Sequence, residues 1–172
     1  MAKSADVLSH TRHAIRLTAQ AVVLVAIGMA FFLRIPQVTG PSMLPHVRTG
    51  ELVLINTLAY RFGPIKRGDI VALSHEEATA QTFLKRIVAL PGDRVRIDHG
   101  TLVVNGTPVT ESYVSFPDHR DVAETTVPAH GIYVLGDNRG ESEDSRTWGP
   151  IDEGSIIGKA IVGLWPPEAL KS

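Results

Sequence analysis

The feature that most constrains this chain is an apolar run close to its N-terminus. Residues Leu17 to Leu33 carry no charge. As a helix they would extend roughly 25 Å, slightly less than the ~30 Å hydrocarbon core of a bilayer. Arg16 and Arg34 flank the run, and their long side chains can reach the two interfaces. The sequence therefore predicts a transmembrane helix over residues 17–34.

The basic residues around this run predict its orientation. Three basic side chains precede the run, whereas only Arg34 follows it closely. Because cytoplasmic flanks carry the excess of Lys and Arg, residues 1–16 are expected in the cytoplasm and residues 35–172 on the outer side. Two other interpretations stay open. A cleaved secretory signal has a similar pattern, although no A-x-A motif follows the run, and the run is short enough for a buried helix.

Composition excludes several classes of function. The formal net charge is −1, so nothing indicates a nucleic-acid partner. There are no cysteines, which excludes disulfides, thiol nucleophiles and cysteine-ligated metals. The seven histidines form no HExxH or similar spacing, so we expect no metal and no other cofactor. The oligomeric state is left open.

Short strand-like segments separated by turns fill the chain beyond the apolar run. Asn105-Gly106 is the strongest hairpin signal. Residues 111–130 are polar and poorly periodic, which indicates mostly loop. With no long amphipathic helix elsewhere, the predicted fold is mostly β: an antiparallel domain of short strands behind one N-terminal transmembrane helix. Strands are expected over residues 51–56, 69–74, 82–90, 94–98, 101–104, 107–109, 131–135 and 155–165.

A serine between two prolines lies eight residues beyond Arg34, in the stretch Gly40-Pro41-Ser42-Met43-Leu44-Pro45-His46. Proline fixes its own φ and disfavours a helical residue before it. This stretch should therefore present Ser42 on a stiff, irregular turn. An ordinary proline-rich linker after a membrane helix would have the same composition, and these residues alone do not separate the two interpretations.

Two further features carry polar groups in unusual places. Lys85 shares one face of an expected strand with Phe83 and Ile87, so it is either a protective lysine at a sheet edge or a desolvated amine. Residues 136–146 (GDNRGESEDSR), which we call the polar loop, follow a strand directly. Such a loop is either a solvated turn or a rigid frame of side-chain hydrogen bonds.

Four segments taken together resemble the sequence boxes of type I signal peptidases. The order of the segments, their separation and the preceding apolar run also match, so the resemblance covers nearly the whole chain. The segments are Gly40-x-Ser42-Met43-x-Pro45, Arg67-Gly68-Asp69-Ile70-Val71, Lys85-Arg86-Ile87-Val88-x-Leu90-Pro91-Gly92-Asp93, and the polar loop with Trp148-Gly149-Pro150-Ile151.

The resemblance implies a serine endopeptidase of the cell membrane that removes signal peptides from exported preproteins after small residues at −1 and −3. By box position, Ser42 would be the nucleophile and Lys85 the general base. Ser142 would orient the lysine, while Asp144 and Arg146 would brace the polar loop. The implied partners are preprotein signal peptides and the lipid bilayer, without metal, cofactor or nucleic acid.

The chemistry of these residue types agrees with the implied roles. A serine hydroxyl needs a neighbouring base, yet a lysine with a pKa of ~10.4 is only about one part in a thousand neutral near pH 7.4. Burial against Phe83, Leu84 and Ile87 would favour the neutral amine. The backbone N–H of Ser42 is the natural donor to an oxyanion.

The substrate is expected to pair as an extended strand between residues 38–40 and residues 81–83. Small apolar pockets in this slot would select small side chains by their size. The residues expected to bind the substrate are Val38, Gly40, Met43, Phe83 and Leu84, with Val47 as a further wall.

Two positions depart from the family pattern. Some members carry a hydroxyl residue two positions before the nucleophile, where this chain has Gly40. The second oxyanion donor is therefore left open. The first box commonly ends Pro-Thr, whereas here His46 follows Pro45. We expect His46 to be structural, because a base four residues from the nucleophile on a proline turn would rarely reach it.

Three alternatives stay open. A dedicated Ser–Lys processing enzyme with few substrates, of the kind that matures conjugative pilins, shares the same boxes. Self-cleaving SOS-type repressors share the dyad and the β fold, but carry a DNA-binding domain instead of an anchor. A non-catalytic, membrane-tethered β binding domain would keep the fold without bringing Ser42, Lys85 and Ser142 together. The sequence does not tell a bacterial membrane from an organellar one.

Overall fold

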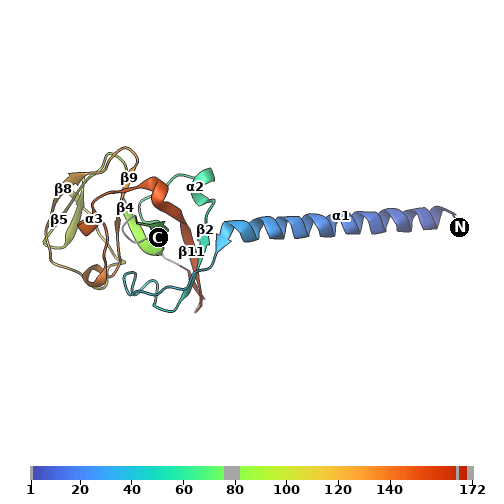
Figure 1. Cartoon of the computed structure of the whole chain (residues 1–172), viewed down its shortest axis with the longest axis horizontal. Coiled ribbons are helices and arrows are strands. Elements are labelled where there is room, and N and C mark those ends of the chain that lie inside the picture. Colours follow the sequence, from blue (N-terminus) through green and yellow to red (C-terminus); the bar gives the residue numbers. More distant parts are fainter. Residues whose placement is uncertain (1, 76–81, 166, 170–172) are drawn as a thin grey trace. The chain divides into compact units, whose positions relative to one another are not determined.

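The computed structural model describes residues 2–75, 82–165 and 167–169, and it divides into two compact units (Figure 1). The first unit ends at Arg34 and the second begins at Ile35. The first unit contains helix α1 (Ala2–Phe32) and the short strand β1 (Leu33–Arg34). The second unit contains all the remaining strands, which are described below.

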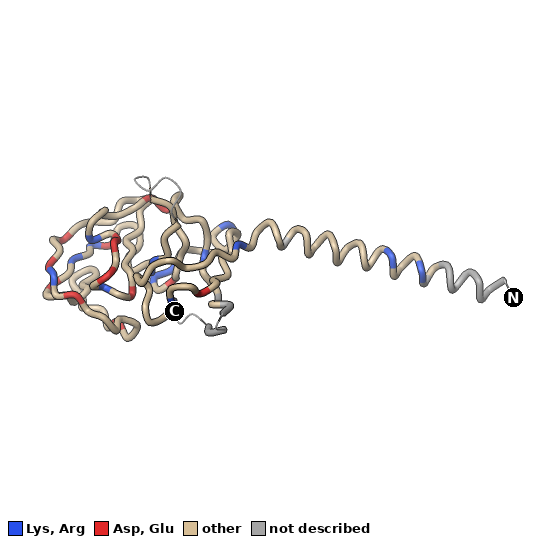
Figure 2. Tube along the Cα trace, turned by 60° about the horizontal axis from the view of Figure 1, so that its bottom comes forward, with Lys and Arg blue, Asp and Glu red and all other residues tan. Residues whose placement is uncertain are grey.

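Helix α1 is long and apolar enough to cross a membrane. Its segment Arg12–Phe32 has a mean hydropathy of 1.9, and none of that segment is buried. Figure 2 shows basic residues toward both ends of the apolar stretch and no charged residue between them. The helix begins well before the predicted span of residues 17–34, because the preceding residues also favour helix.

Antiparallel strands form two sheets in the second unit, which confirms the predicted fold class. The larger sheet has the order β2 (Leu52–Asn56), β11 (Ile156–Trp165), β3 (Ile70–Ser74), β4 (Thr82–Ala89), β9 (Gly131–Leu135) and β10 (Ile151–Asp152), and β12 (Pro167–Ala169) pairs with β11. The smaller sheet has the order β7 (Thr107–Pro108), β6 (Thr101–Val104), β5 (Arg94–Asp98) and β8 (Val122–Thr126).

The remaining helical elements of the described second unit are short. They are α2 (Ala59–Phe62), α3 (Ser145–Trp148) and the 3₁₀ turns η1 (Arg139–Glu141) and η2 (Glu153–Ser155). The predicted Asn-Gly hairpin joins β6 to β7. Both of its turn residues have positive φ, 52° at Asn105 and 80° at Gly106, as a type I′ turn requires.

The sequence analysis missed strand β8, as well as the short strands β1, β10 and β12. Strand β8 lies within residues 111–130, which were expected to be mostly loop, and it pairs with β5. Its five residues are exposed or half-buried, so the strand has no apolar alternation to reveal it. Backbone pairing with β5, rather than burial of a face, determines its structure.

The central strands of the larger sheet are buried on both faces. Along β3, Ile70 and Ala72 pack in one apolar cluster, whereas Val71 and Leu73 pack in the other. Strand β4 lies between β3 and β9, so its backbone is paired on both sides. A third cluster packs the end of β4 against the smaller sheet. Side chains in the middle of β4 are therefore removed from water, whatever their polarity.

Candidate active site

The nucleophile candidate lies on a turn of residues 40–47, which we call the serine turn. Backbone hydrogen bonds from Leu44 N to Pro41 O (3.0 Å) and from Val47 N to Met43 O (2.9 Å) close it, and the Leu44–Pro45 peptide is cis. Met43 and Val47 are buried in the apolar cluster on one face of the larger sheet. These two side chains anchor the turn, while Ser42 remains half-buried.

Lys85 is a buried amine in the middle of β4. The residue is only 2% exposed, and its Nζ lies 5.6 Å from the centre of the Phe83 ring. The edge-lysine interpretation is wrong, because β4 is paired on both sides. Burial lowers the pKa of Lys85 from 10.5 to about 8. The charges of Asp144 and Glu143 oppose this shift, and the charge of Arg146 adds to it.

Gly136 is the point at which two of the candidate residues meet. Strand β4 pairs with β9 so that Arg86 faces Leu135, and the same register continued by one residue beyond the end of β9 would bring Lys85 opposite Gly136. Directly opposite residues of an antiparallel pair point to the same face. A side chain at Gly136 would collide with the hydroxyl of Ser142 and with the carbonyl oxygen of Ser42. Ser142 Oγ and the carbonyl oxygen of Ser42 therefore pack directly against Gly136, at the end of the strand that pairs with the strand carrying Lys85.

The polar loop is a rigid frame and not a solvated turn. Asp144 is fully buried; it pairs with Arg146 (Oδ1 to Nε, 2.8 Å) and accepts a hydrogen bond from Gly136 N (3.0 Å). Arg146 also donates to the carbonyl of Ser142 (3.1 Å) and pairs with Asp118 (3.0 Å). These bonds hold Ser142 and Gly136 in fixed positions relative to each other.

Three residues that the sequence analysis did not single out tie the serine turn to this frame. Asn138 donates from its backbone N to Ser42 O (3.0 Å) and from Nδ2 to Pro41 O (3.2 Å). Its neighbour Asp137 is fully buried and receives two hydrogen bonds from Arg86, at 2.8 and 2.7 Å. All three lie within the segments that resemble the family boxes, and this was the one feature of the sequence that could have identified them as part of the site.

The reactive atoms are not hydrogen-bonded in this state. Within the described residues, no hydrogen bond involves Ser42 Oγ or Lys85 Nζ, and Ser142 Oγ is buried without a partner. Catalytic hydrogen bonds are often long in the absence of substrate and tighten when it binds. A buried hydroxyl without a partner is costly, so Ser142 has an unused capacity to bond the lysine amine.

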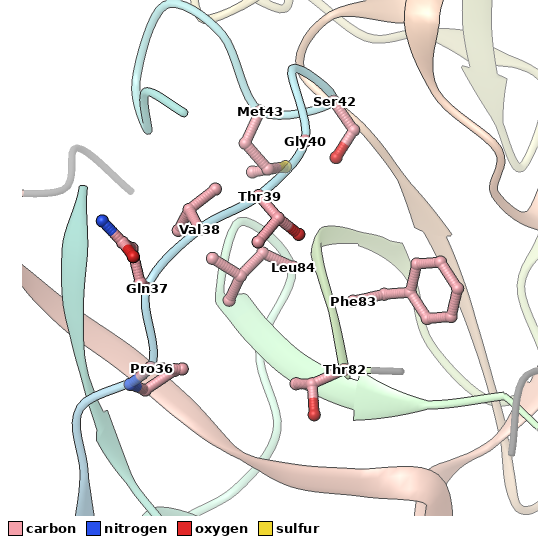
Figure 3. A pocket seen from close by; sticks show the side chains of 10 residues that line it. All are labelled: Pro36, Gln37, Val38, Thr39, Gly40, Ser42, Met43, Thr82, Phe83 and Leu84. Atoms are coloured by element: carbon pink, nitrogen blue, oxygen red, sulfur yellow. The ribbon is translucent and has the colours of Figure 1, made fainter. Parts of the chain in front are cut away.

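A pocket of about 370 Å³ opens beside Ser42. Figure 3 shows segment 36–43 along one side and the start of β4 along the other, with Ser42 and Pro36 at opposite ends. Val47 is buried in the core and does not line the pocket, and Gln81 lies outside the described residues. The lining contains the five expected residues, Val38, Gly40, Met43, Phe83 and Leu84, together with Ser42 and with Thr39 and Thr82 from the two segments expected to flank the slot; Pro36 and Gln37 were not expected.

One group of side chains elsewhere has the composition of a metal site. The ligand atoms of Asp98, His99 and Asp121 lie within 4.8 Å of one another on the described surface. His99 Nδ1 is 2.7 Å from Asp98 Oδ1, and His99 N donates to Asp121 at 2.6 Å. These hydrogen bonds account for the grouping without an ion.

A serine hydroxyl beside a buried, weakly basic lysine defines a class of hydrolases that work without histidine. The chain belongs to the signal peptidase family, peptidase S26, whose model matches residues 11–165.

Known members of this family are similar over most of the chain. A signal peptidase I from Leptolyngbya laminosa is 35% identical, over 86% of this chain and 77% of that one. One from Bacillus caldolyticus is 35% identical, over 85% of this chain and 87% of that one. The crystal structure of a signal peptidase I from Enterococcus faecalis V583 is 29% identical, with a TM-score of 0.49, over 56% of this chain and 97% of that one.

Proposed function

We propose that this protein is a membrane-bound serine endopeptidase that removes N-terminal signal peptides from exported preproteins, with Ser42 as nucleophile and Lys85 as general base. One observation carries the assignment of these residues. In a member of the signal peptidase family, Ser142 Oγ and the Ser42 carbonyl pack against Gly136, at the end of the strand that pairs with β4, and β4 carries a buried lysine with a pKa of about 8.

The lowered pKa makes Lys85 a usable base. With a pKa of about 8, roughly a fifth of the amine is neutral near pH 7.4. The neutral amine accepts the hydroxyl proton while Ser42 Oγ bonds to the substrate carbonyl carbon. The C–N bond then breaks, and the ammonium gives its proton to the leaving amine. A water molecule, deprotonated by the same amine, hydrolyses the ester and releases the serine.

The oxyanion of these steps needs donors that are already in place. The backbone N–H of Ser42 donates no hydrogen bond within the described residues, so it is available for this role. Gly40 has no hydroxyl to offer, and a Cβ built there meets no atom within 4 Å. A hydroxyl side chain would therefore fit at position 40, but Gly40 provides no side-chain hydrogen-bond donor to the oxyanion.

The pocket beside Ser42 supports selection of small side chains. An extended peptide places alternate side chains on the same face, so residues −1 and −3 point the same way. Paired as a strand between segment 36–40 and the start of β4, the substrate would direct both into the pocket of about 370 Å³. Val38, Met43 and Leu84 limit the size of what fits there.

The proposed setting follows from the helix and the flanking charges. Residues 1–16 are cytoplasmic, residues 17–34 cross the membrane, and residues 35–172 form the catalytic domain on the outer side. Ser42 is eight residues beyond Arg34, which keeps the reactive serine close to the membrane surface, where a signal peptide still held in the bilayer presents its cleavage site.

Cleavage of a preprotein in detergent tests the assignment. We expect Ser42→Ala and Lys85→Ala to abolish processing while the far-ultraviolet circular dichroism stays unchanged. Ser115→Ala and Lys66→Ala are matched controls, because both residues are exposed, and these variants should process at the wild-type rate. Turnover by either Ser42→Ala or Lys85→Ala would remove the proposed mechanism.

A further inference from the structure

His46 lies at the far end of the serine turn, four residues after Ser42. Pro45 precedes it, and the fully buried Val47 follows it. The side chain is only 18% exposed, and its Nδ1 atom is completely buried without a hydrogen bond. Burying a polar atom without a hydrogen-bond partner costs folding free energy, so its presence here needs an explanation. The proposed reaction uses no histidine, so this ring nitrogen is unexplained.

The group that Nδ1 faces is the carboxylate of Asp137. The Nδ1 atom lies 3.3 Å from Oδ2, in contact but without the alignment of a hydrogen bond. Arg86 donates to both oxygens of this carboxylate, from Nε to Oδ1 and from Nη2 to Oδ2, and the Arg86 guanidinium lies 4.2 Å from the centre of the Tyr113 ring. Arg86 therefore holds the Asp137 carboxylate in place independently of His46.

This environment determines which nitrogen of the ring carries a proton. A bare Nδ1 would place its lone pair against a carboxylate oxygen in a buried site, where such repulsion is strong. An Nδ1–H donates toward that oxygen instead, in either the neutral tautomer or the cation. A small rotation of the ring aligns the bond. The structure thus favours a proton on Nδ1.

The same two loop residues hold both ends of the serine turn. Asn138 bonds the carbonyls of Pro41 and Ser42 at the beginning, and Asp137 contacts His46 at the end. We propose that His46 is a positioning residue for Ser42, whose Nδ1–H against the buried Asp137 carboxylate fixes the far end of the turn. This inference rests on the proposed function of Ser42.

The consequence is geometric. Asp137 directly follows Gly136, the residue against which Ser142 Oγ and the carbonyl oxygen of Ser42 pack. Attaching both ends of the serine turn at this place keeps the hydroxyl at a constant distance from the amine on β4. Releasing one end lets the turn shift, and a displacement of about 1 Å at a reacting atom lowers the rate by up to about 100-fold.

Three substitutions separate positioning from simple packing. In His46→Asn, the side-chain amide nitrogen can occupy the position of the histidine Nδ1 atom. In His46→Gln, the amide nitrogen occupies the position of Nε2 instead. His46→Ala removes both. In the full chain in detergent, we expect His46→Asn to stay within about threefold of wild-type kcat. We expect His46→Gln and His46→Ala to lose roughly 10- to 100-fold in kcat with KM nearly unchanged, because the substrate pocket is intact.

The control is His130→Asn, since this histidine side chain is 82% exposed; it should change neither parameter. Equal kcat in His46→Asn and His46→Gln would overturn the proposal. If the thermal unfolding midpoint falls in step with kcat across the series, the role is only structural, and the proposal is equally overturned.

A second measurement is independent of activity. Histidine labelled with ¹⁵N in the full chain, with the His46 signals assigned by their loss in His46→Asn, reports which ring nitrogen is protonated. We expect a protonated Nδ1, and a bare Nδ1 would refute the inference even in an active enzyme. Failure of the proposed function has a different signature, because wild type and Ser42→Ala would then behave alike toward a preprotein while the Nδ1 signal stays as expected.

Discussion

At the scale of single residues, one lysine determines how the reaction depends on pH. Lys85 acts as a base only when neutral, and its pKa of about 8 lies within the working range. The sign is therefore fixed: kcat/KM rises with pH, by about tenfold per unit well below pH 8, and levels off above it. Measuring kcat/KM on a short peptide from about pH 6 to pH 9 checks this. A profile that is flat or falling over this range would exclude Lys85 as the base.

Gly136 offers a second test at this scale. A methyl group there would collide with the Ser142 hydroxyl and the Ser42 carbonyl, both held by the polar frame. We expect Gly136→Ala to lower kcat by roughly 100-fold or more, because the reacting groups must move apart. Gly140→Ala is the matched control in the same loop, since its Cβ meets only Asn138 Oδ1 at 3.9 Å.

Peptide cleavage assays and thermal unfolding of both variants separate the possible outcomes. Gly140→Ala should match wild type in both measurements. Wild-type kcat in Gly136→Ala would contradict the packing of Ser42 and Ser142 against this glycine.

The difference between Gly136 and Lys85 shows what a sequence reveals about a site. Ser42 and Lys85 drew attention as a serine between prolines and a lysine among apolar residues, but their roles were predicted only from the family resemblance. Gly136 could not be singled out, since the importance of a missing side chain depends on its neighbours in the fold, which are Ser142 of the same loop and Ser42 of the distant serine turn. The position of Lys85, at a sheet edge or in the interior, depends on the order of the strands. The alternation of side chains along one strand does not determine that order.

At the scale of elements, a buried ion pair joins β4 to the loop after β9. Arg86 and Asp137 are both fully buried and share two hydrogen bonds. Removing one partner leaves the other as an uncompensated buried charge, so Arg86→Leu should lower the free energy of unfolding by about 3–5 kcal/mol. Arg67 is the matched control: it pairs with Asp93 but is about half exposed, and Arg67→Leu should cost no more than about 1 kcal/mol.

Urea unfolding of both variants measures the two changes. Equal small losses would mean that the Arg86 pair contributes no more than a surface pair. In that case Asp137 would not be a fixed support for the serine turn.

The sheets themselves were largely predictable, since burial alternates along β5 and runs unbroken along β3. The Asn105-Gly106 pair also predicted its hairpin turn, and both residues have the positive φ that this turn requires. Strand β8 was missed because its pairing with β5, and not its side chains, determines it. The order of strands was beyond prediction for a similar reason, because β11 inserts between β2 and β3 from a hundred residues further along the chain.

At the scale of the whole molecule, the two units have different sources of stability. The three apolar clusters described in the structure consist of residues from the second unit, whereas the apolar side chains of α1 are exposed. Exposed Val22, Leu24 and Phe31 are unfavourable in water, and a lipid environment would cover them. The apolar run predicted a helix of this kind, because a helix that is apolar all round either lies in a protein core or spans a membrane.

The orientation of this helix is the last prediction, and the chain is well suited to testing it. The protein has no cysteine, so a single introduced thiol reports the side of the membrane on which it lies. Ser4 lies near the start of α1, before the apolar run, and Ser115 is exposed in the second unit. In intact cells, a membrane-impermeant maleimide should label Ser115→Cys and not Ser4→Cys, since basic residues before the apolar run favour a cytoplasmic N-terminus. Lysis should make both thiols reactive, which controls for burial. Labelling of Ser4→Cys alone in intact cells would place the serine and the lysine in the cytoplasm, on the wrong side for cleaving exported preproteins.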